Sequence, residues 1–551
     1  MPGKDKEKPA KKDRSTQPID FDKVRYPGYK ELIYRKKNQE HLPTEASKIT
    51  KMLNLGGPAD MGGRPAPLPE NLSGHIKFDS EFECGNIDQV RQRSLREYDL
   101  WIRNDTNGAS NIQWFYFRMQ NPENFTEMIR INIVNFTKGN SLFYYGMKPS
   151  FWSLKGNQKN GAGWFHGGFN VDYDISPYHV EINKMNPHKP KSYYCMSFDF
   201  KFEFEQDEIY VAYTIPYTYT QLQSHIYQIK AVAETSPFQF IKFSSIGKSN
   251  GGVDVPLLKI TNPDKKKNPY KPTVVILGRQ HSGETHSSFI IHGLINFLLQ
   301  RDVLSHKLRE HFEFWILPMV NPDGIVSGNY RCNTQGKDMN RCFFADEDPE
   351  AKMRLTEVEH IRHFMEENFS KKVADKRGKL KMFLDIHAHS GQRDIFLYAP
   401  HASTDDANKK IQTFPSILDD ISPYFSYDGC KFGNEKYKKN CARLGVFRDF
   451  DLHYSYTIES SCWGYTDPET DATIQFKELD FIIFGKHLAE GIARHFQITV
   501  SDQDRTSMFS GLDIQLDFAL YEDEKETKKK ARILKKKGGK PLGGKLFKIT
   551  A

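Results

Sequence analysis

Short segments that alternate apolar and polar residues dominate the chain between residues 75 and 215. Such alternation places every second side chain on one face, as in strands that are buried on one side only. Turn-forming runs such as NDTNG at 104–108 separate these segments. The pattern predicts strands at 75–82, 96–103, 112–119, 128–136, 193–200, 201–205 and 209–214. Because helical periodicity is scarce here, we expect an antiparallel β-sandwich.

The pattern changes after residue 216, where short apolar runs alternate with longer segments of helical periodicity. It predicts strands at 255–261, 271–278, 312–319, 381–387, 394–398 and 454–459, and helices at 219–229, 287–304, 350–368 and 479–495. This alternation favours an α/β domain with a parallel or mixed sheet and helices on both faces. In such sheets the functional residues lie in loops beyond the carboxyl ends of strands.

The length of 551 residues exceeds what one hydrophobic core supports, so we expect several domains. We predict a disordered basic leader at 1–70, the sandwich at 71–215, the α/β domain at 216–500 and a Lys-rich tail at 501–551. The net charge of +8 arises in the tail, because residues 525–551 hold eleven Lys or Arg and one acid. We expect the tail to be solvated, and the alternative is attraction to an acidic polymer.

Seven scattered cysteines without a C-x-x-C pair indicate free thiols in a reducing compartment. The chain contains no run of about 18 apolar residues, so we expect no transmembrane helix. Its charged start lacks an apolar segment, so we expect no secretory signal. Together these features predict a cytoplasmic protein.

His281 and Glu284 lie three residues apart, directly after the strand predicted at 271–278. At the end of a strand this spacing allows two ligands of a catalytic zinc ion to converge, although H-x-x-E also occurs by chance on surfaces. His387 ends another predicted strand and would complete a His₂Glu set. His389 competes with it, because strand alternation puts both rings on one face.

Arginine residues that suit carboxylate binding follow the strand predicted at 312–319. The guanidinium groups of Arg331 and Arg341 each offer paired hydrogen-bond donors. Asn340, the neighbour of Arg341, adds a neutral donor. Arg331 could instead stabilise an oxyanion. A third alternative is a structural ion pair with an acid such as Asp338 or Asp346.

Glu459 ends the apolar strand predicted at 454–459. A carboxylate there is costly to bury unless it has a function. Beside zinc it would act as general base toward water and then as proton donor to the leaving amine.

In this order the motifs resemble those of the cytosolic carboxypeptidases, the intracellular zinc carboxypeptidases that shorten glutamate chains on tubulin. The matching runs are HSGET, NPDG, GNYRC, KDMNR, LDIHAHS and YTIESS. FECGN, EYDLWIRNDTN, QWFYF and VAYTIPYTYT resemble the accessory β-sandwich of that family. The resemblance extends roughly from Gly74 to Phe496 and implies a zinc carboxypeptidase domain at 216–500.

The resemblance also implies the roles of individual residues. One Zn²⁺ per chain would be bound by His281, Glu284 and His387, because the first His of D-x-H-x-H-S is the ligand in the family. Glu459 would be the catalytic base and Arg331 would polarise the scissile carbonyl. Asn340 and Arg341 would bind the terminal carboxylate. Arg443 matches a basic position that confers glutamate specificity, and Arg448 is a weaker candidate.

Two departures from the family pattern stand out. Ser282 replaces the Pro that usually follows the first His, which alters loop stiffness and leaves the ligand type unchanged. The segment 431–440 matches poorly. Tyr437 within it could close over the substrate as a mobile Tyr does in digestive relatives, but a solvated loop Tyr is the preferred interpretation.

We therefore expect a monomeric metallocarboxypeptidase that removes glutamates from the acidic tails of tubulin, microtubules or other polyglutamylated proteins. It would be cytoplasmic and associated with the cytoskeleton or cilium, with no nucleic-acid or membrane partner. The alternatives are a related zinc deacylase and a catalytically silent microtubule-associated structural protein.

Overall fold

A computed structural model describes residues 31–35, 76–94, 96–107, 111–179, 192–235, 240–263, 271–343, 355–373, 379–501 and 504. Most of the predicted leader and tail lies outside these residues. Within the leader, Glu31–Arg35 forms strand β1, which pairs antiparallel with β3 (Ile87–Ser94). The prediction of disorder is therefore wrong for these residues.

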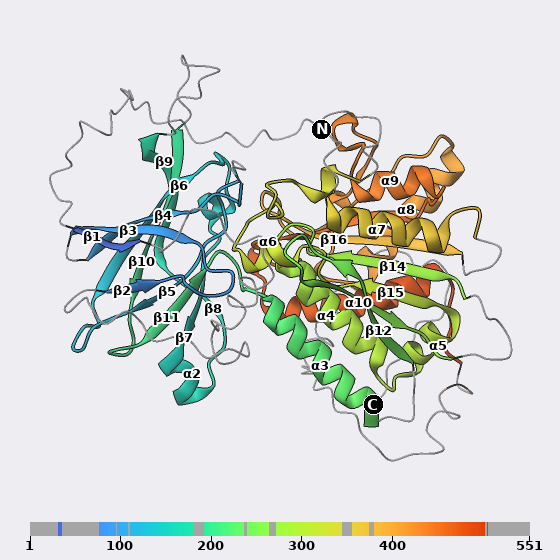
Figure 1. The fold of residues 1–551 in the computed structure, drawn as a ribbon, viewed down its shortest axis with the longest axis horizontal. Coiled ribbons are helices and arrows are strands. Elements are labelled where there is room, and N and C mark those ends of the chain that lie inside the picture. The colour runs from blue at the N-terminus through green and yellow to red at the C-terminus, as the bar shows by residue number, and fades with distance from the viewer. Residues whose placement is uncertain are drawn as a thin grey trace.

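The N-terminal unit is a sandwich of two sheets (Figure 1). In the described residues the first sheet has the order β1-β3-β4-β6-β10-β9 and the second has the order β2-β5-β11-β7-β8. Their remaining strands are β2 (Lys77–Asp79), β4 (Glu97–Ile102), β5 (Tyr116–Gln120), β6 (Met128–Phe136), β7 (Ser150–Ser153), β8 (Phe165–His166), β9 (Phe169–His179), β10 (Ser192–Lys201) and β11 (Glu208–Ala212). The pairing is antiparallel except between β4 and β6, which run parallel.

The predicted strand at 201–205 is absent from the structure, because β10 ends at Lys201 and the chain turns before β11. Gln206 adopts a left-handed backbone with φ of 48°, and the following amide of Asp207 donates to Asn121 Oδ1 at 2.7 Å, which fixes the turn. Strand β9 escaped prediction because exposed and buried positions do not alternate regularly along it. Short helices η2 (Leu142–Tyr145) and α2 (Leu154–Asn160) complete this unit.

The C-terminal unit is built on a mixed sheet of order β12-β13-β15-β14-β16-β19-β17-β18. Its strands are β12 (Ile241–Lys248), β13 (Asp254–Ile260), β14 (Thr273–Gly278), β15 (Glu313–Leu317), β16 (Leu380–His389), β17 (Ile395–Ala399), β18 (Lys431–Phe432) and β19 (Ser455–Ser461). The pairs β15–β14, β14–β16 and β16–β19 are parallel, so their carboxyl ends meet at one edge. Strands β20 (Gly464–Thr466) and β21 (Thr473–Gln475) form a separate hairpin.

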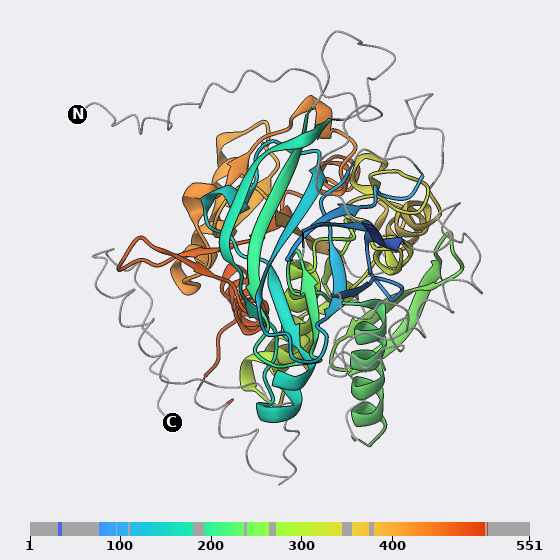
Figure 2. The same ribbon diagram turned by 90° about the vertical axis from the view of Figure 1, so that its left-hand side faces the viewer.

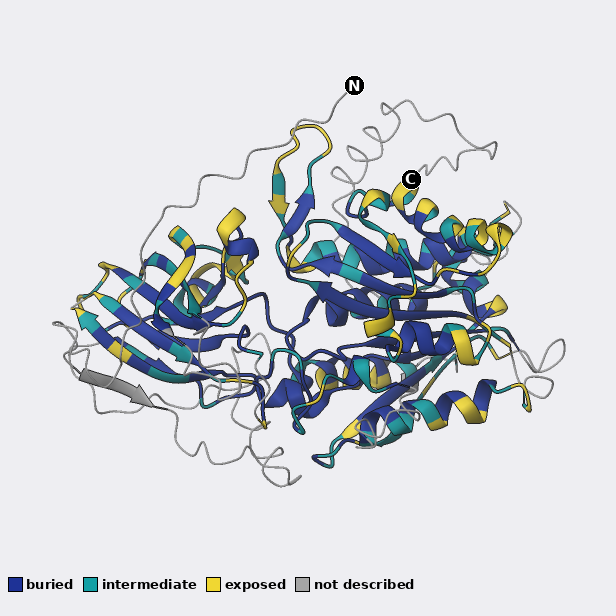
Figure 3. Cartoon of the chain, turned by 90° about the horizontal axis from the view of Figure 1, so that it is seen from above, coloured by how far each residue is buried: buried dark blue, intermediate teal, exposed yellow. Residues whose placement is uncertain are grey.

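Helices cover both faces of this sheet, as the pattern predicted (Figures 1 and 3). On one face lie α4 (His286–Leu299), α8 (Asp405–Ile421) and α10 (Glu478–His495), and on the other α7 (Thr356–Phe369) and α9 (Ala442–Asp449). Strand β14 contributes to both layers, because Val274 and Ile276 face the first and Val275 and Leu277 the second. This two-sided burial explains its unbroken apolar sequence.

The helix predicted at 287–304 is two helices, α4 and α5 (Val303–His311). Asp302 Oδ1 accepts from the amides of Leu304 and Ser305, so it caps a new helix. The helix predicted at 219–229 extends further, as α3 (Tyr219–Thr235). The remaining helices are α6 (Pro322–Val326), η3 (Met339–Arg341), η5 (Tyr427–Gly429) and η6 (Lys436–Lys438).

The two units lie side by side in Figure 1, and in Figure 2 the sandwich is seen in front of the α/β unit. Buried side chains of both belong to one continuous hydrophobic cluster. At the junction Tyr213 meets Tyr330 with 6.2 Å between ring centroids, and Tyr217 meets Phe289 at 5.0 Å. The sandwich is therefore a fixed neighbour of the α/β unit.

All seven cysteines are free, which confirms the prediction of unpaired thiols. Among the described helices, none combines the length and the apolar character needed to cross a membrane.

Candidate metal centre

The loop between β14 and α4 carries His281 and Glu284 at the carboxyl edge of the central sheet. Arg279 begins it in the left-handed region, with φ of 57°, and is 2 % exposed. Its guanidinium donates to the carbonyl of Ser282 through Nε at 3.2 Å and through a terminal nitrogen at 2.7 Å. This buried arginine shapes the loop, a role that the sequence pattern did not reveal.

Residues 282 and 283 pack the loop against the segment that contains Arg331. The Gly283 amide donates to the Tyr330 carbonyl at 2.7 Å, and a Cβ at Gly283 would lie 2.8 Å from the Tyr330 ring. The Ser282 hydroxyl donates to the Cys332 carbonyl at 3.3 Å and accepts from Asn321 at 3.1 Å. Serine at 282 therefore adds contacts that a proline ring could not make.

Three side chains converge at one point: His281, Glu284 and His387. The Nδ1 atom of His281 lies 2.8 Å from Glu284 Oε1, and the Nδ1 atom of His387 lies 2.8 Å from Glu284 Oε2. The two Nδ1 atoms are 3.1 Å apart. All three residues are buried, with at most 4 % of each residue exposed. The potential ligand atoms lie within 4.8 Å of one another.

The outward-facing nitrogen of each histidine is held by a carboxylate. Nε2 of His281 lies 3.0 Å from Asp338 Oδ1, and Nε2 of His387 lies 2.9 Å from Asp385 Oδ2. Asp385 is itself fixed by Gln280, whose Nε2 donates to it at 2.6 Å. Carboxylates that hold the distal nitrogen are the usual second layer of histidine metal sites. No pattern in the sequence indicated this role for Asp338 or Asp385.

The protonation of the two histidine rings, which these contacts determine, indicates whether the three residues fit a cation. Because a carboxylate accepts at each Nε2, that nitrogen carries the proton of a neutral ring, and each Nδ1 presents a lone pair. Both lone pairs then face the Glu284 carboxylate, which is also an acceptor. A positive charge at this point resolves the conflict, and two nitrogens with one carboxylate suit zinc.

The pKa shifts of the candidate ligands also indicate that positive charge is favoured at this point. Burial alone would lower the pKa of His387, but Asp385 and Glu284 raise it well above its usual value. Burial would raise the pKa of Glu284, but His281 and His387 lower it well below its usual value. The centre thus favours a carboxylate anion surrounded by positive charge.

His389 lies in the same strand but outside the convergent group. It is two residues beyond His387 and therefore about 6.6 Å further along β16. Its ring packs edge-on against Phe396, with 5.2 Å between centroids. Alternation predicts the face of a residue but not its distance along the strand, so the pattern could not separate the two histidines.

Glu459 lies on β19, where it pairs in register with His387 on β16. It is partly exposed and lines the same cavity as the three convergent residues. Removal from bulk water raises the pKa of its carboxyl, His387 opposes this shift, and Glu284 and Asp385 add to it. A carboxyl with a raised pKa beside a metal centre suits general acid–base chemistry.

Arg331 reaches the cavity from a segment that the sandwich holds in place. The Asp105 carboxylate accepts from the amides of Tyr330, Arg331 and Cys332 at 2.6, 2.8 and 2.7 Å. Arg331 Nε donates to Asp338 Oδ2 at 2.7 Å, so the ion-pair alternative is present in the structure. Among the described residues its terminal nitrogens have no hydrogen-bond partner, and they remain available to a ligand.

Asn340 and Arg341 lie on η3, which the Asp338 side chain caps at 2.9 Å. The Asn340 side-chain oxygen accepts from the Ala442 amide at 2.9 Å, which directs its nitrogen toward His387 Nε2 at 3.1 Å. One terminal nitrogen of Arg341 donates to the Asn340 carbonyl at 2.8 Å. Both residues line the cavity.

The two arginines of helix α9 occupy different environments. Arg443 is 1 % exposed, lines the cavity and donates to the Gly433 carbonyl at 3.2 Å. Arg448 bonds Asp449 at 2.8 Å on the surface and does not line the cavity. Five residues turn a helix by about 140°, so the two side chains leave different faces. This geometry gives no support to Arg448 as a substrate-binding residue.

All predicted site residues except Arg448 therefore line one cavity of about 460 Å³. Tyr437 is 72 % exposed on η6 and is not among the lining residues. The sandwich contributes Asn111, Ile112, Gln113, Thr137 and Lys138 to the wall, none of which the sequence analysis singled out. Their signal is weak, because they lie in turns and strand ends of another unit.

Comparison with known proteins agrees with this geometry. Residues 226–476 match the family described as zinc carboxypeptidase, and residues 78–213 match the cytosolic carboxypeptidase N-terminal domain. Cytosolic carboxypeptidase 6 of Mus musculus is 32 % identical over 439 residues, covering 78 % of this chain and 76 % of its own length. Cytosolic carboxypeptidase 4 of Mus musculus is 31 % identical over 424 residues, covering 73 % of this chain. The chain spans only 36 % of the length of that relative.

The fold is shared with solved structures. A metallo-carboxypeptidase from Burkholderia cenocepacia superposes with a TM-score of 0.61 at 22 % identity, covering 77 % of this chain and 99 % of its own. A metallo-carboxypeptidase from Pseudomonas aeruginosa superposes with a TM-score of 0.60 at 20 % identity, covering 76 % of this chain and 99 % of its own. The two family matches together extend across the sandwich and the α/β unit that carries the His-Glu-His centre. The chain belongs to the cytosolic carboxypeptidase family of zinc carboxypeptidases.

Proposed function

We propose that this chain is a zinc-dependent metallocarboxypeptidase that hydrolyses glutamates from the C-terminal or side-chain polyglutamate of tubulin or similar acidic proteins. The observation that carries the proposal is the gathering of His281, Glu284 and His387 with Glu459 and several cations in one cavity. The relatives named above and the resemblance of the motifs support the choice of reaction.

The metal would be held by Nδ1 of His281, Nδ1 of His387 and the Glu284 carboxylate. Zinc in such a set supplies a Lewis acid that polarises a carbonyl and makes water more acidic. Asp338 and Asp385 keep the two rings oriented through their Nε2 atoms. Three protein ligands leave room for water and substrate, as catalytic sites require.

Glu459 is the proposed proton carrier. It accepts a proton from the water that attacks the scissile carbonyl and passes it to the leaving nitrogen as the C–N bond breaks. Its position on the strand beside His387 places it at the edge of the metal centre.

Arg331 and Arg341 are the proposed anion-binding groups of the reaction. The terminal nitrogens of Arg331 would donate to the carbonyl oxygen as negative charge develops there. Arg341, with Asn340, would bind the terminal carboxylate of the substrate and so restrict cleavage to the last residue. The Asn340 nitrogen also donates to Asp385 Oδ2 at 3.4 Å, so it would share its two protons between that carboxylate and the substrate.

Arg443 is the proposed group for an acidic side chain in the last position. It is a buried arginine on the cavity wall, and its Nε has no hydrogen-bond partner in the described structure. Its nearest carboxylate is that of Glu435, at 3.7 Å. A second carboxylate, brought by a glutamate, would find donors available.

The proposed setting follows from this substrate. A monomer acting on tubulin or microtubules would work in the cytoplasm, at the cytoskeleton or cilium, with no nucleic-acid or membrane partner. The basic segment at 525–551 lies outside the described residues, and its charge would attract acidic tails at low ionic strength. Deleting it should slow the reaction on microtubules at low salt and leave short peptides unaffected.

The decisive experiment measures zinc content and the release of free glutamate from polyglutamylated tubulin. We expect one zinc per chain and release that Glu459→Gln abolishes while the variant keeps its zinc. Bound zinc without glutamate release from tubulin or from any acidic C-terminal peptide would overturn the proposal. Release of amino acids from N-acyl substrates alone would instead indicate the deacylase, and no turnover at all would indicate the silent structural protein.

A further inference from the structure

Five cationic side chains line the cavity, and some of them form an ion pair with a carboxylate while others do not. Arg331 pairs with Asp338 at 2.7 Å. Lys438 and Arg443 share Glu435, at 3.2 and 3.7 Å. Within the described part of the chain, the other two, Lys138 and Arg341, have no carboxylate within ion-pair distance. Arg341 already has a proposed role at the chain end, whereas Lys138 has none.

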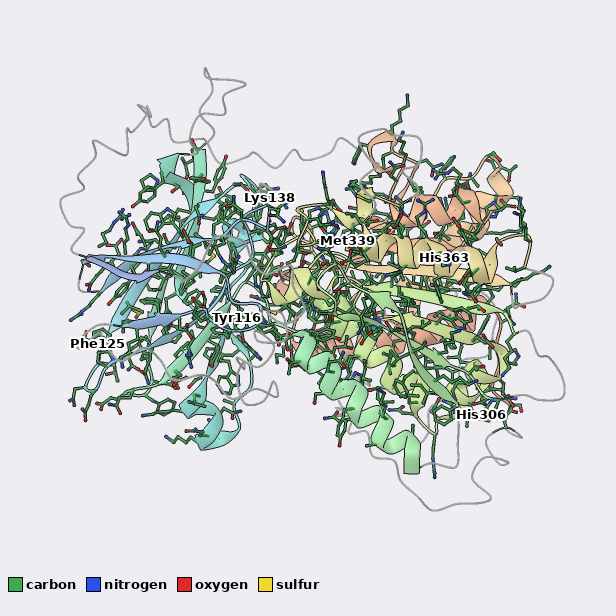
Figure 4. The ribbon with its side chains drawn as sticks, viewed as in Figure 1. Tyr116, Phe125, Lys138, His306, Met339 and His363 are labelled. Atoms are coloured by element: carbon green, nitrogen blue, oxygen red, sulfur yellow. The ribbon has the colours of Figure 1, made fainter. Side chains whose placement is uncertain are left out.

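Lys138 belongs to the sandwich and not to the unit that carries the metal centre. It follows the end of β6 by two residues, and its carbonyl accepts from the Tyr173 hydroxyl of β9 at 2.5 Å. Figure 4 shows it at the side of the sandwich that faces the α/β unit. Its backbone is thus fixed by the sandwich while its side chain extends across the junction.

Among the residues that the structure describes, the ammonium group of Lys138 makes one hydrogen bond, at the cavity wall. It donates to Ser390 Oγ, in the loop directly after β16. An ammonium group has three protons, so two remain for a ligand. Lys138 is exposed and lines the cavity, so solvent and substrate can reach its side chain.

An uncompensated cation in a partly enclosed cavity attracts an anion more strongly than one on an open surface. Arg341 and Arg443, proposed for the chain end and for the last side chain, both come from the α/β unit. A peptide held there by its last residue must extend past the remaining wall, which includes the sandwich residues Gln113, Thr137 and Lys138. Lys138 is the cation that the sandwich contributes to this remaining wall, beside Ser390 of the α/β unit.

Resting on the proposed carboxypeptidase function, we propose that Lys138 is a specificity-determining residue. It binds the side-chain carboxylate of the penultimate substrate residue, the residue that becomes the new chain end after cleavage. Arg443 selects the residue that is released, and Lys138 selects the residue that stays. The two domains thus recognise two successive acidic residues of the substrate.

The test uses three peptides that differ only in their last two residues: Glu-Glu, Ala-Glu and Glu-Ala. Dissociation constants are measured in the Glu459→Gln background, so that the result does not depend on turnover, and kcat/KM is measured with Glu459 intact. We expect Lys138→Met to weaken the preference for Glu-Glu over Ala-Glu by about tenfold. The preference for Glu-Glu over Glu-Ala should stay within twofold.

Three further variants show whether the change in preference is specific to the charge of Lys138. Lys138→Arg should keep the penultimate preference, and Arg443→Gln should lose the preference at the last position instead. Lys201→Met removes an exposed lysine of the same unit and should change neither. A structural role of Lys138 would weaken all three peptides equally and leave their ratios unchanged.

An unchanged Glu-Glu to Ala-Glu ratio in Lys138→Met, in binding and in kcat/KM, would overturn the inference. So would the absence of binding to every peptide. Binding that shows the expected ratios without turnover would support Lys138 as the selector of this site while overturning the proposed reaction, so the two failures can be told apart.

Discussion

The Asp105 carboxylate accepts a hydrogen bond of 2.8 Å from the backbone amide of Arg331, across the junction between the two units. The same carboxylate binds the amides on either side of Arg331. Thr106 adds two hydrogen bonds to Asn329, at 3.0 and 2.9 Å. The sandwich therefore determines where the backbone of Arg331 lies, and it takes part in building the site.

Replacing Asp105 with alanine should impair both stability and activity. Three amides would lose a charged acceptor, and a hydrogen bond to a charged group contributes about 1.5–3 kcal/mol. A displaced Arg331 should lower kcat by about 10- to 100-fold, because small misplacements of catalytic groups are costly. Melting temperature and kcat/KM of the purified variant test both effects.

Glu203→Gln is the matched control for Asp105, since Glu203 is an exposed acid of the same unit. It should leave both quantities unchanged. Full activity of Asp105→Ala would show that Arg331 keeps its position without this contact.

Removal of the metal should destabilise the protein. A ligand that binds only the folded state at 1,000 times its Kd stabilises that state by about 4 kcal/mol, so chelation should lower the melting temperature. His387→Ala and Glu284→Gln should reduce bound zinc from one per chain to a small fraction. Elemental analysis of dialysed protein measures this directly.

His389→Gln is the control for the metal ligands, because His389 lies on the same strand outside the convergent group. It should retain one zinc per chain. Loss of zinc in this variant, with zinc retained in His387→Ala, would reverse the ligand assignment.

Arg443 and Arg448 offer a comparison within one helix. Arg443→Gln should lower kcat/KM for peptides ending in glutamate about tenfold or more relative to peptides ending in alanine, since an ionic hydrogen bond is lost. Arg448→Gln should change neither value by more than twofold, because Arg448 lies on the surface. Equal effects of the two substitutions would argue against Arg443 as the selector.

The stability of the fold should fall in mild acid because of a buried histidine pair. His225 stacks on His292 with 3.5 Å between ring centroids. Burial lowers the pKa of His225 to about 4, while its hydrogen bond to Asn296 opposes the shift. Burial and the neighbouring His225 lower the pKa of His292 well below its usual value.

Because these pKa values lie below that of unfolded histidine, near 6.5, the unfolded chain takes up protons first as the pH falls. The stability is complete above about pH 6.5 and is lost toward pH 4. At pH 5, His225 alone should cost about 2 kcal/mol. Thermal melting at pH 7 and pH 5 should therefore show a smaller acid shift for His225→Gln than for the unchanged chain.

His363→Gln serves as the control for the pH experiment, because His363 is a surface residue with 72 % of its side chain exposed. It should melt with the same pH dependence as the unchanged chain. If His225→Gln did so as well, the pair would not contribute to acid unfolding.

The sequence predicted most accurately those strands whose hydrophobic pattern reflects burial against their immediate neighbours. Strand β6 was predicted with its observed bounds, and β14 within two residues, because most positions of β6 and all positions of β14 are buried. Strand β9 was missed, since its exposed and buried residues follow no regular period. Helix α8 was missed although its buried residues Ile411, Phe414, Pro415 and Leu418 follow a helical period, because a proline such as Pro415 usually marks the end of a helix. The split between α4 and α5 depends on the Asp302 cap.

The amino-acid sequence by itself determined the order of the motifs and the strand ends on which His281, His387 and Glu459 lie. The resemblance of the motifs already favoured His387 over His389 as the ligand. Only the tertiary structure decided that Asp338 and Asp385 hold the histidines and that Arg448 lies outside the cavity. It also decided that the sandwich contributes Asp105 and Lys138 to the site. The reason is physical: periodicity reports the side of an element on which a residue lies, whereas a site requires distances between residues that the fold brings together from far apart in the chain.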